Sequence, residues 1–400
     1  MTRPWPVVAD DRRAVPERDG LSSPFGEIRS ASPLSDSFRR RLLLRLASRI
    51  GILLRRHQPM KTQCELLVPH MSQYRDFDDR GETRYLPYLM YFHRTDYRSA
   101  VINTDRLGFR VARGAEGSGS VATAPARGRV RLVAGSSAAL GVGATSDATT
   151  VPSRLWTRYA PSTPWLNFGG RSHSSMQELI LLLSYRHLLP EVDEIVILSG
   201  FNDLATSRLP KWQVGDNGAY FFCGDFFEAM ERLRRRDRGR GRRRRERRGE
   251  RVSPHTAAAA RDPAEIVATA LDLTSRHLEG YRSLAGPATR ISYVLQPLAP
   301  WIRDEPAPQE RLLFDELDGM SRQGTFTEMF GQIATREVWS LYSEGLRVAC
   351  EKQDVSFVDL NSLLAEEAPK DSWIFVDRAH CTDAGYDLIS RIIARQLNLS

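Results

Sequence analysis

Five short apolar runs, separated by longer helical stretches, constrain the fold of this chain most strongly. The candidate strands are residues 130–134, 165–168, 195–199, 291–295 and 355–360. Helices are expected over residues 151–159, 176–187, 263–284, 336–353 and 383–397. Such an alternation is typical of parallel strands joined by crossover helices. We therefore expect an α/β fold, in which a doubly wound parallel sheet of five strands carries helices on both faces.

Polar residues follow the ends of these candidate strands. Ser137 comes after the first strand, Ser172 after the second and Asn202 after the third. Asp377 and His380 lie in a loop before the final helix. In an open sheet of this kind, the ligand site lies beyond the carboxyl ends of the strands. The sequence therefore predicts that these residues, which come from distant parts of the chain, meet at one edge of the sheet.

Together these residue types supply the groups of a serine acyl-transfer site. Such a site needs a nucleophile, a base, a group that orients the base, and an oxyanion hole. Asp377 and His380 are three residues apart, so the carboxylate can lie beside the imidazole and fix its tautomer. The side-chain N–H of Asn202 could stabilise a developing oxyanion by about 3 kcal/mol. Each motif alone also has an ordinary explanation, as a Ser-Gly turn, a capping Asp or an Asn-Asp turn.

Four short blocks carry a resemblance to a known family. They are Gly135-Ser136-Ser137 with Gly141, Asn167-Phe168-Gly169 running to Ser172, Gly200-Phe201-Asn202-Asp203, and Asp377-Arg378-Ala379-His380 followed by Thr382-Asp383-Ala384-Gly385-Tyr386. In this order they resemble the SGNH hydrolases, also called the GDSL esterase/lipase family, across roughly residues 130–398. The resemblance implies a flavodoxin-like doubly wound sheet with an N-terminal extension outside it, and no cofactor or metal.

The resemblance also assigns a role to each block. Ser137 would be the nucleophile, His380 the base and Asp377 the carboxylate that orients the base. The oxyanion hole would consist of the backbone N–H groups of Ser137 and Ser172 and the side chain of Asn202.

Two positions depart from the family pattern. Ser136 stands where the family has Asp or Gly, so either Ser136 or Ser137 could attack, and we favour Ser137. Ser172 stands where the family has glycine. A serine can donate its backbone N–H there if the local φ and ψ suit a residue with a Cβ.

The predicted function is that of a serine esterase, which cleaves a small-molecule ester or thioester through an acyl-serine intermediate. One alternative is an acyltransferase that moves an acyl or aminoacyl group from CoA, a carrier protein or tRNA to a small-molecule acceptor. Another is a non-catalytic binding protein on the same scaffold. The sequence alone leaves the three functions open.

The basic character of the chain comes from one segment. The net charge is +8, but residues 232–251, which begin at Arg232 and end at Arg251, carry a local charge of +10 and leave the remainder at −2. This segment has no apolar period and is expected to be a disordered, solvated insertion. The alternative is electrostatic contact with an anionic acyl donor or a nucleic acid.

The chain before the sheet is expected to form two further regions. Residues 1–60 are predicted to be an extension, disordered or helical and basic, and the apolar runs within residues 38–56 are interrupted by arginine too often to span a bilayer. A helix on a membrane surface is the alternative. Residues 61–128 are interpreted as an N-terminal subdomain or lid with a linker, and residues 129–400 as the hydrolase domain. An Asn-Thr…Gly-Phe-Arg segment at residues 103–110 would belong to that lid, or cover a sheet edge.

Cysteine usage favours a reducing compartment. The four cysteines show no paired spacing typical of a zinc site or a disulfide framework, and a cytoplasmic location fits best.

Three residues near the blocks receive minor roles: His173 as a pocket or surface residue, Gln296 as part of the site's edge and Cys381 as a packing residue.

Overall fold

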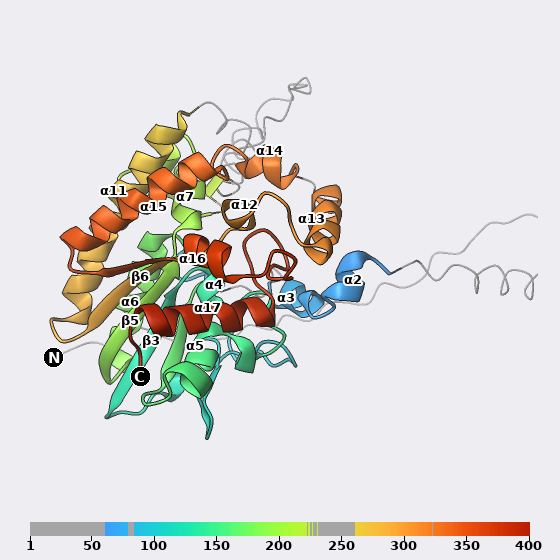
Figure 1. The fold of residues 1–400 in the computed structure, drawn as a ribbon. Helices are drawn as coiled ribbons and strands as arrows, with labels where there is room; N and C mark the ends of the chain where they lie inside the picture. Colours follow the sequence, from blue (N-terminus) through green and yellow to red (C-terminus); the bar gives the residue numbers. More distant parts are fainter. Residues whose placement is uncertain are drawn as a thin grey trace, which may run out of the picture. The chain divides into compact units, whose positions relative to one another are not determined.

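Five parallel strands form the central sheet of this protein. The computed structural model describes residues 61–78, 84–221, 223, 224, 226, 230, 261–321 and 323–400. The strands are β3 (Arg129–Gly135), β4 (Trp165–Gly169), β5 (Glu191–Ser199), β6 (Arg290–Leu295) and β7 (Ser356–Asp359), and their order across the sheet is β4-β3-β5-β6-β7. Figure 1 labels the three central strands, β3, β5 and β6. Each neighbouring pair is parallel. Numbered along the chain, the order is 2-1-3-4-5, which is the flavodoxin-like arrangement that we expected.

Both faces of the sheet are buried, which explains why its strands read as continuous apolar runs. In β3 every residue except Arg129 is buried. Leu132 and Ala134 belong to one core cluster, whereas Val133 belongs to the other. Side chains of a strand alternate between faces, so the two clusters are the two layers of core between sheet and helices.

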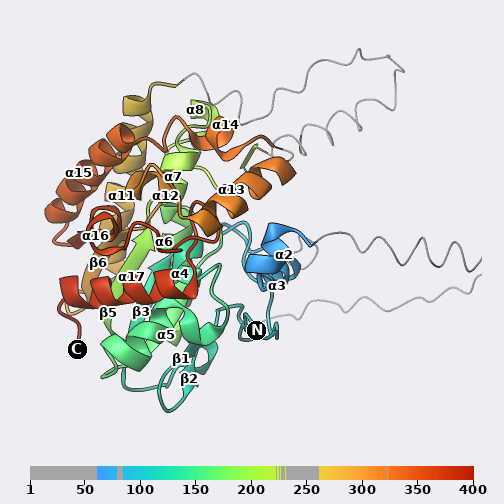
Figure 2. The same cartoon turned by 45° about the vertical axis from the view of Figure 1, so that its right-hand side comes forward.

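Helices cover each face of the sheet (Figures 1 and 2). The first core cluster packs under α6 (Ser175–Tyr185), α11 (Pro263–Ala285) and α15 (Arg336–Lys352). The second packs under α5 (Val151–Arg154), α16 (Leu360–Glu367) and α17 (Asp383–Gln396). The starts of two helices follow standard capping chemistry. Asp262 and Thr382 accept N–H groups in the first turns of α11 and α17.

The remaining elements complete the described chain. These are α2 (Gln63–Leu67), α3 (Met71–Phe77), β1 (Ala112–Arg113), β2 (Ser118–Gly119), η1 (Val121–Thr123), α4 (Ser137–Leu140), η2 (Asp147–Thr149), η3 (Leu155–Tyr159), η4 (Arg186–Leu188), α7 (Phe201–Thr206), α8 (Lys211–Val214), α12 (Ala299–Ile302), α13 (Pro308–Met320) and α14 (Phe326–Phe330). All five expected strands occur, and β5 begins four residues earlier than predicted. The helix expected over residues 151–159 is α5 continued by the wider turn η3.

Residues before the sheet pack against the turn that follows β3. Tyr74 and Phe77 of α3 form a small apolar cluster with Val101, Ile102, Leu140 and others. β1 and β2 form a short antiparallel hairpin within residues 61–128, the region interpreted as a subdomain or lid with a linker. The basic helix expected within residues 38–56 and the insertion 232–251 lie outside the described residues. No helix in the described ranges is long and apolar enough to cross a bilayer.

Candidate active site

A sharp turn at the end of β3 presents Ser137. Gly135 has a φ of 133°, and a Cβ there would lie 2.1 Å from the Leu198 carbonyl oxygen of β5, so only glycine fits. Ser136 is extended, and Ser137 is the first residue of α4. Ser137 is 9% exposed. The turn therefore places this hydroxyl just beyond the carboxyl end of the strand.

Ser137, His380 and Asp377 form one hydrogen-bonded line. The Ser137 Oγ lies 2.8 Å from His380 Nε2. The other ring nitrogen, Nδ1, lies 2.7 Å from Asp377 Oδ2 and 3.0 Å from Oδ1. The fold therefore brings together three side chains that lie as much as 243 residues apart in the chain.

The neighbouring serine has a different partner. Ser136 is fully buried, and its Oγ donates to Gln296 Oε1 at 2.8 Å. Of the two candidate nucleophiles, Ser137 is therefore the one that contacts His380. Gln296 thus lies behind the nucleophile turn, where it holds Ser136.

Backbone and side-chain contacts fix Asp377. The backbone N–H groups of Ala379 and His380 donate to Asp377 Oδ1 at 2.8 and 2.9 Å. Burial by itself would raise the pKa of Asp377, but the adjacent His380 and these N–H donors outweigh burial and lower the pKa below its usual value. An ionised carboxylate at Nδ1 keeps the proton on that nitrogen, which leaves Nε2 free to accept a proton from Ser137.

The loop after β4 lies against the nucleophile helix. A Cβ on Gly169 would lie 2.2 Å from the Leu140 backbone nitrogen, so the end of β4, from which this loop starts, is in close contact with α4. Ser172 has a φ of 54°, within the left-handed region that glycine favours. Its carbonyl oxygen accepts the Tyr91 hydroxyl at 2.8 Å. Serine therefore adopts the conformation that a glycine in this position would favour.

Asn202 links the loop after β5 to the loop after β4. It is buried in the first turn of α7, and its Nδ2 donates to the His173 carbonyl oxygen at 2.8 Å. The amide group carries a second N–H. The sequence indicated a role for this side chain but not its anchor on His173.

Asp203 makes a set of buried contacts that the sequence analysis did not identify. Asp203 accepts the Ser175 backbone N–H at 3.1 and 3.2 Å and the Ser175 hydroxyl at 2.9 Å. The same hydroxyl lies 2.7 Å from His277 Nδ1. Burial raises the pKa of Asp203 to about 6 and lowers the pKa of His277 to about 4. Here serine lies between the carboxylate and the imidazole, so this group lacks the order of a catalytic triad.

Two residues beside the blocks are buried. His173 is fully buried, not at the surface, and its Nε2 lies 3.2 Å from the Tyr91 carbonyl oxygen. Burial lowers the pKa of His173 to about 4, which favours the neutral ring. Cys381 packs in the second core cluster, and burial raises the pKa of its thiol. Within the described residues, no group of three or more His, Cys, Asp or Glu side chains could hold a metal ion.

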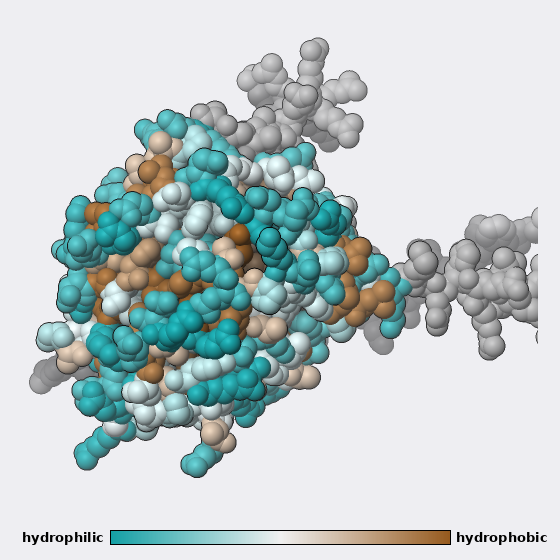
Figure 3. All heavy atoms as spheres, viewed as in Figure 1, coloured by the Kyte–Doolittle hydropathy of each residue, from teal (hydrophilic) through white to brown (hydrophobic). Residues whose placement is uncertain are grey.

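A pocket of about 460 Å³ opens beside Asp377. Its apolar lining comes from α3, α13 and the loops before α3 and α17: Val68, Met71, Leu317, Met320 and Val376. Asp377 and the charged side chains of Lys61, Glu65 and Arg75 also line it. Figure 3 shows apolar surface over α2 and α13, where Leu66, Leu312 and Met320 are exposed. An apolar region therefore adjoins the serine-histidine-aspartate line.

The fold and this geometry define an α/β protein with a serine-histidine-aspartate group at the carboxyl edge of a flavodoxin-like sheet. No family model and no curated protein matches the chain. The chain is similar to solved structures of a lipolytic G-D-S-L protein and of two esterases. A member of the lipolytic protein G-D-S-L family from Veillonella parvula is 11% identical, with 68% of this chain and 98% of that chain covered and a TM-score of 0.36. Est24, a carbohydrate acetylesterase from Sinorhizobium meliloti, is 13% identical, with 68% and 99% covered and a TM-score of 0.37. The aryl esterase of M. smegmatis is 13% identical, with 68% and 98% covered and a TM-score of 0.35.

Proposed function

We infer that this protein is a serine hydrolase of the SGNH type, which cleaves a small-molecule ester or thioester through an acyl intermediate on Ser137. The observation that carries the proposal is the line from Ser137 Oγ through His380 to Asp377, with contacts of 2.8 and 2.7 Å. A nucleophile, a base and an orienting carboxylate in this order are what acyl transfer to a serine hydroxyl requires.

In the first half-reaction, Ser137 Oγ attacks the substrate carbonyl carbon while His380 Nε2 takes the hydroxyl proton. The tetrahedral intermediate collapses, the bond to the leaving alcohol or thiol breaks, and His380 returns the proton to the leaving group. In the second half-reaction, His380 takes a proton from water, whose oxygen attacks the acyl carbon. The second intermediate collapses, the bond to Ser137 Oγ breaks, and His380 returns its proton to that oxygen, which releases the acid and restores the hydroxyl.

The proposed oxyanion hole consists of the backbone N–H groups of Ser137 and Ser172 and the Asn202 side chain. Two contacts support it. The left-handed backbone of Ser172 is held by Tyr91, and the Asn202 amide is anchored on the adjacent His173 carbonyl. Donors that are fixed before the reaction stabilise charge without reorganising during it.

The substrate is proposed to carry an apolar group. The support is the pocket beside Asp377, whose lining includes the apolar side chains of Val68, Met71, Leu317, Met320 and Val376. The measurement is a series of p-nitrophenyl esters from acetate to octanoate. A specificity constant that rises with chain length agrees with the proposal, and one that falls steadily contradicts it.

Labelling with a fluorophosphonate tests the mechanism without assuming a substrate. The wild-type protein is expected to form one adduct on the peptide that contains Ser137. The Ser136→Ala variant is the matched control and should still be labelled, whereas Ser137→Ala should not. A folded wild-type protein that stays unlabelled, or labels at another serine, contradicts the proposal.

The acyl acceptor is decided by a second measurement. Hydrolysis of p-nitrophenyl acetate is followed with and without added alcohols and amines. If water is the acceptor, product release should be independent of these nucleophiles. A slow reaction that one class of acceptor accelerates, with formation of the acylated acceptor, would show an acyltransferase instead.

A further inference from the structure

The helix that carries Ser137 is a single turn. α4 contains only four residues, and it begins at Ser137 and ends at Leu140. The last carbonyl groups of a helix have no partner within it. At 1.5 Å of rise per residue, the end of α4 lies roughly 5 Å from Ser137, so a shift of that end also displaces the hydroxyl.

Two side chains from other parts of the chain hold the end of α4. Asn167 Nδ2 donates to the carbonyl oxygens of Ala139 and Leu140, both at 3.2 Å. Arg110 Nη1 donates to the carbonyl oxygens of Leu140 and Gly141 at 3.1 and 2.8 Å. Asn167 lies in the second block, whereas Arg110 ends the Asn-Thr…Gly-Phe-Arg segment, whose role the sequence analysis left open.

Tyr74 reinforces the contact of Arg110 with this turn. Its hydroxyl lies 2.9 Å from the Gly141 carbonyl oxygen and 2.8 Å from that of Ala144. The same hydroxyl accepts Arg110 Nη1 at 2.9 Å. Arg110 and Tyr74 therefore form one contact with the residues that follow α4.

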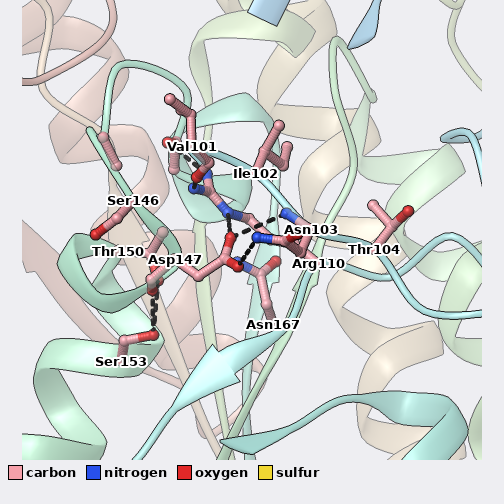
Figure 4. A network of polar contacts seen from close by, with 12 residues as sticks. Val101, Ile102, Asn103, Thr104, Arg110, Ser146, Asp147, Thr150, Ser153 and Asn167 are labelled. Carbon is pink, nitrogen blue, oxygen red and sulfur yellow. Dashed lines mark hydrogen bonds and ion pairs between the residues drawn. The ribbon is translucent and has the colours of Figure 1, made fainter. Parts of the chain in front are cut away.

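A buried carboxylate fixes the orientation of Arg110 (Figure 4). Arg110 Nε donates to Asp147 Oδ1 at 2.9 Å, and the two side chains are 0% and 3% exposed. Asn103 Nδ2 donates to Asp147 Oδ2 at 2.7 Å. The remaining amino group, Nη2, donates to the Val101 carbonyl oxygen at 2.7 Å. Hydrogen bonds therefore hold all three nitrogens of the guanidinium, and the Asp147 carboxylate compensates its charge.

We propose that Arg110, oriented by Asp147, is a positioning residue that holds α4 so that Ser137 Oγ stays within reach of His380. This proposal rests on the proposed function, because it assigns Arg110 a role in that reaction. It differs from a covering role for residues 103–110, which would affect stability alone. Arg110 does not contact Ser137 or His380, so its effect on the reaction passes through the backbone of α4.

The experiment compares Arg110→Lys with the wild-type protein, well below the melting temperature of both. Lysine keeps the charge but has a single ammonium group that cannot reproduce the fork of donors. A misplacement of about 1 Å at a reacting group can cost roughly 100-fold in rate. We expect kcat to fall by about 10- to 100-fold with KM within about twofold. The rate of fluorophosphonate labelling should fall by the same factor.

Two further variants keep the test decisive. Arg290→Lys is the matched control, because Arg290 pairs with the buried Glu194 at 2.7 Å near the opposite end of the strands. It should retain kcat. If Arg110→Lys does not fold, Tyr74→Phe takes its place in the experiment, because it removes the hydroxyl that contacts both Arg110 and Gly141. In this variant kcat and the labelling rate should fall, and KM should stay unchanged.

One result would overturn the proposal. If Arg110→Lys or Tyr74→Phe lowers the melting temperature while the folded protein keeps its kcat and labelling rate, residues 103–110 only cover the fold. Failure of the proposed function is distinct, because the wild-type protein would then show no labelling at Ser137.

Discussion

Asn202 and His173 are joined by a hydrogen bond of 2.8 Å, from the side-chain amide of one to the backbone carbonyl of the other. The bond connects the turn after β5 to the loop that contains Ser172. It fixes the orientation of the Asn202 amide through a contact within the protein, before any substrate is present. Its second N–H is the donor that we assign to the oxyanion hole.

Replacement of Asn202 by alanine should lower kcat by roughly 100- to 1,000-fold, because one of the proposed oxyanion donors is lost. KM should change by only a few-fold, since this interaction strengthens as negative charge develops on the substrate oxygen. Steady-state kinetics on p-nitrophenyl acetate measure both constants. Asn202→Asp should be similarly impaired, because a carboxylate keeps the shape but lacks the N–H donor. A folded Asn202→Ala variant with nearly full kcat would remove Asn202 from the site.

Replacement of Asp377 by asparagine should lower kcat by about 10,000-fold, because the imidazole then loses the partner that holds its tautomer. The control is Asp318→Asn, which changes the partner of Arg378 in the same loop, at 2.6 Å, without altering the contact between Asp377 and His380. In this control, kcat should fall by less than tenfold. Equal losses in the two variants would mean that loop position, and not the carboxylate of Asp377, determines the rate.

Replacement of Ser172 by glycine should stabilise the protein by roughly 0.5–1 kcal/mol, because a residue with a Cβ is strained at positive φ. Activity should remain within a few-fold, since the proposed donor is the backbone N–H. Ser172→Val should lower both stability and activity, because a β-branched residue fits this region poorly. Thermal denaturation and kinetics of the two variants check the prediction. A large loss of activity in Ser172→Gly would show that the hydroxyl itself takes part.

Replacement of Asp203 by asparagine should change how stability depends on pH. Burial raises the pKa of Asp203 from 3.8 to about 6, so the folded protein holds this proton to higher pH than the unfolded chain does. Stability from this group is therefore present below pH 4 and is lost as the pH rises to about 6, by up to about 3 kcal/mol. The melting temperature of Asp203→Asn, relative to wild type, should be higher at pH 7 than at pH 4. A difference that does not vary with pH would contradict it.

Deletion of residues 232–251 should leave kcat and KM for an uncharged ester unchanged, because every proposed site residue lies elsewhere in the chain. With an anionic donor such as an acyl-CoA, the same comparison tests the electrostatic role of the arginines. That role would be supported if the deletion raised KM for the anionic substrate but not for the uncharged ester. Added salt should then raise KM for the anionic substrate in the wild-type protein in the same way.

The sheet could be predicted from the sequence because its strands are buried on both faces and therefore read as apolar runs. Long helices such as α11 and α15 could be predicted for a similar reason, since their apolar residues recur with helical spacing. One-turn helices such as α4 and α12 carry too few residues for a periodic pattern. Contacts between elements form them, and these contacts are not visible in a local stretch of sequence.

Within the candidate site, local spacing indicated that Asp377 and His380 would lie side by side. The contacts of Asp203 with Ser175 and of Ser175 with His277 join residues 28 and 102 positions apart, and no local pattern connects them. Arg110 was noticed as part of a motif, but its burial against α4 depends on Asp147, 37 positions later. Charged residues are seldom fully buried unless they are paired, so composition alone would place Arg110 at the surface.

Ser136 and Ser137 are adjacent, yet one hydroxyl is bound to Gln296 and the other to His380. Ser136 is the extended residue that precedes α4 and Ser137 is the first residue of that helix, so the point at which α4 begins determines which serine meets the imidazole. A shift of the chain by one residue at this turn would move the Ser137 hydroxyl away from His380. Insertions or deletions within β3 should therefore abolish the activity even in variants that still fold.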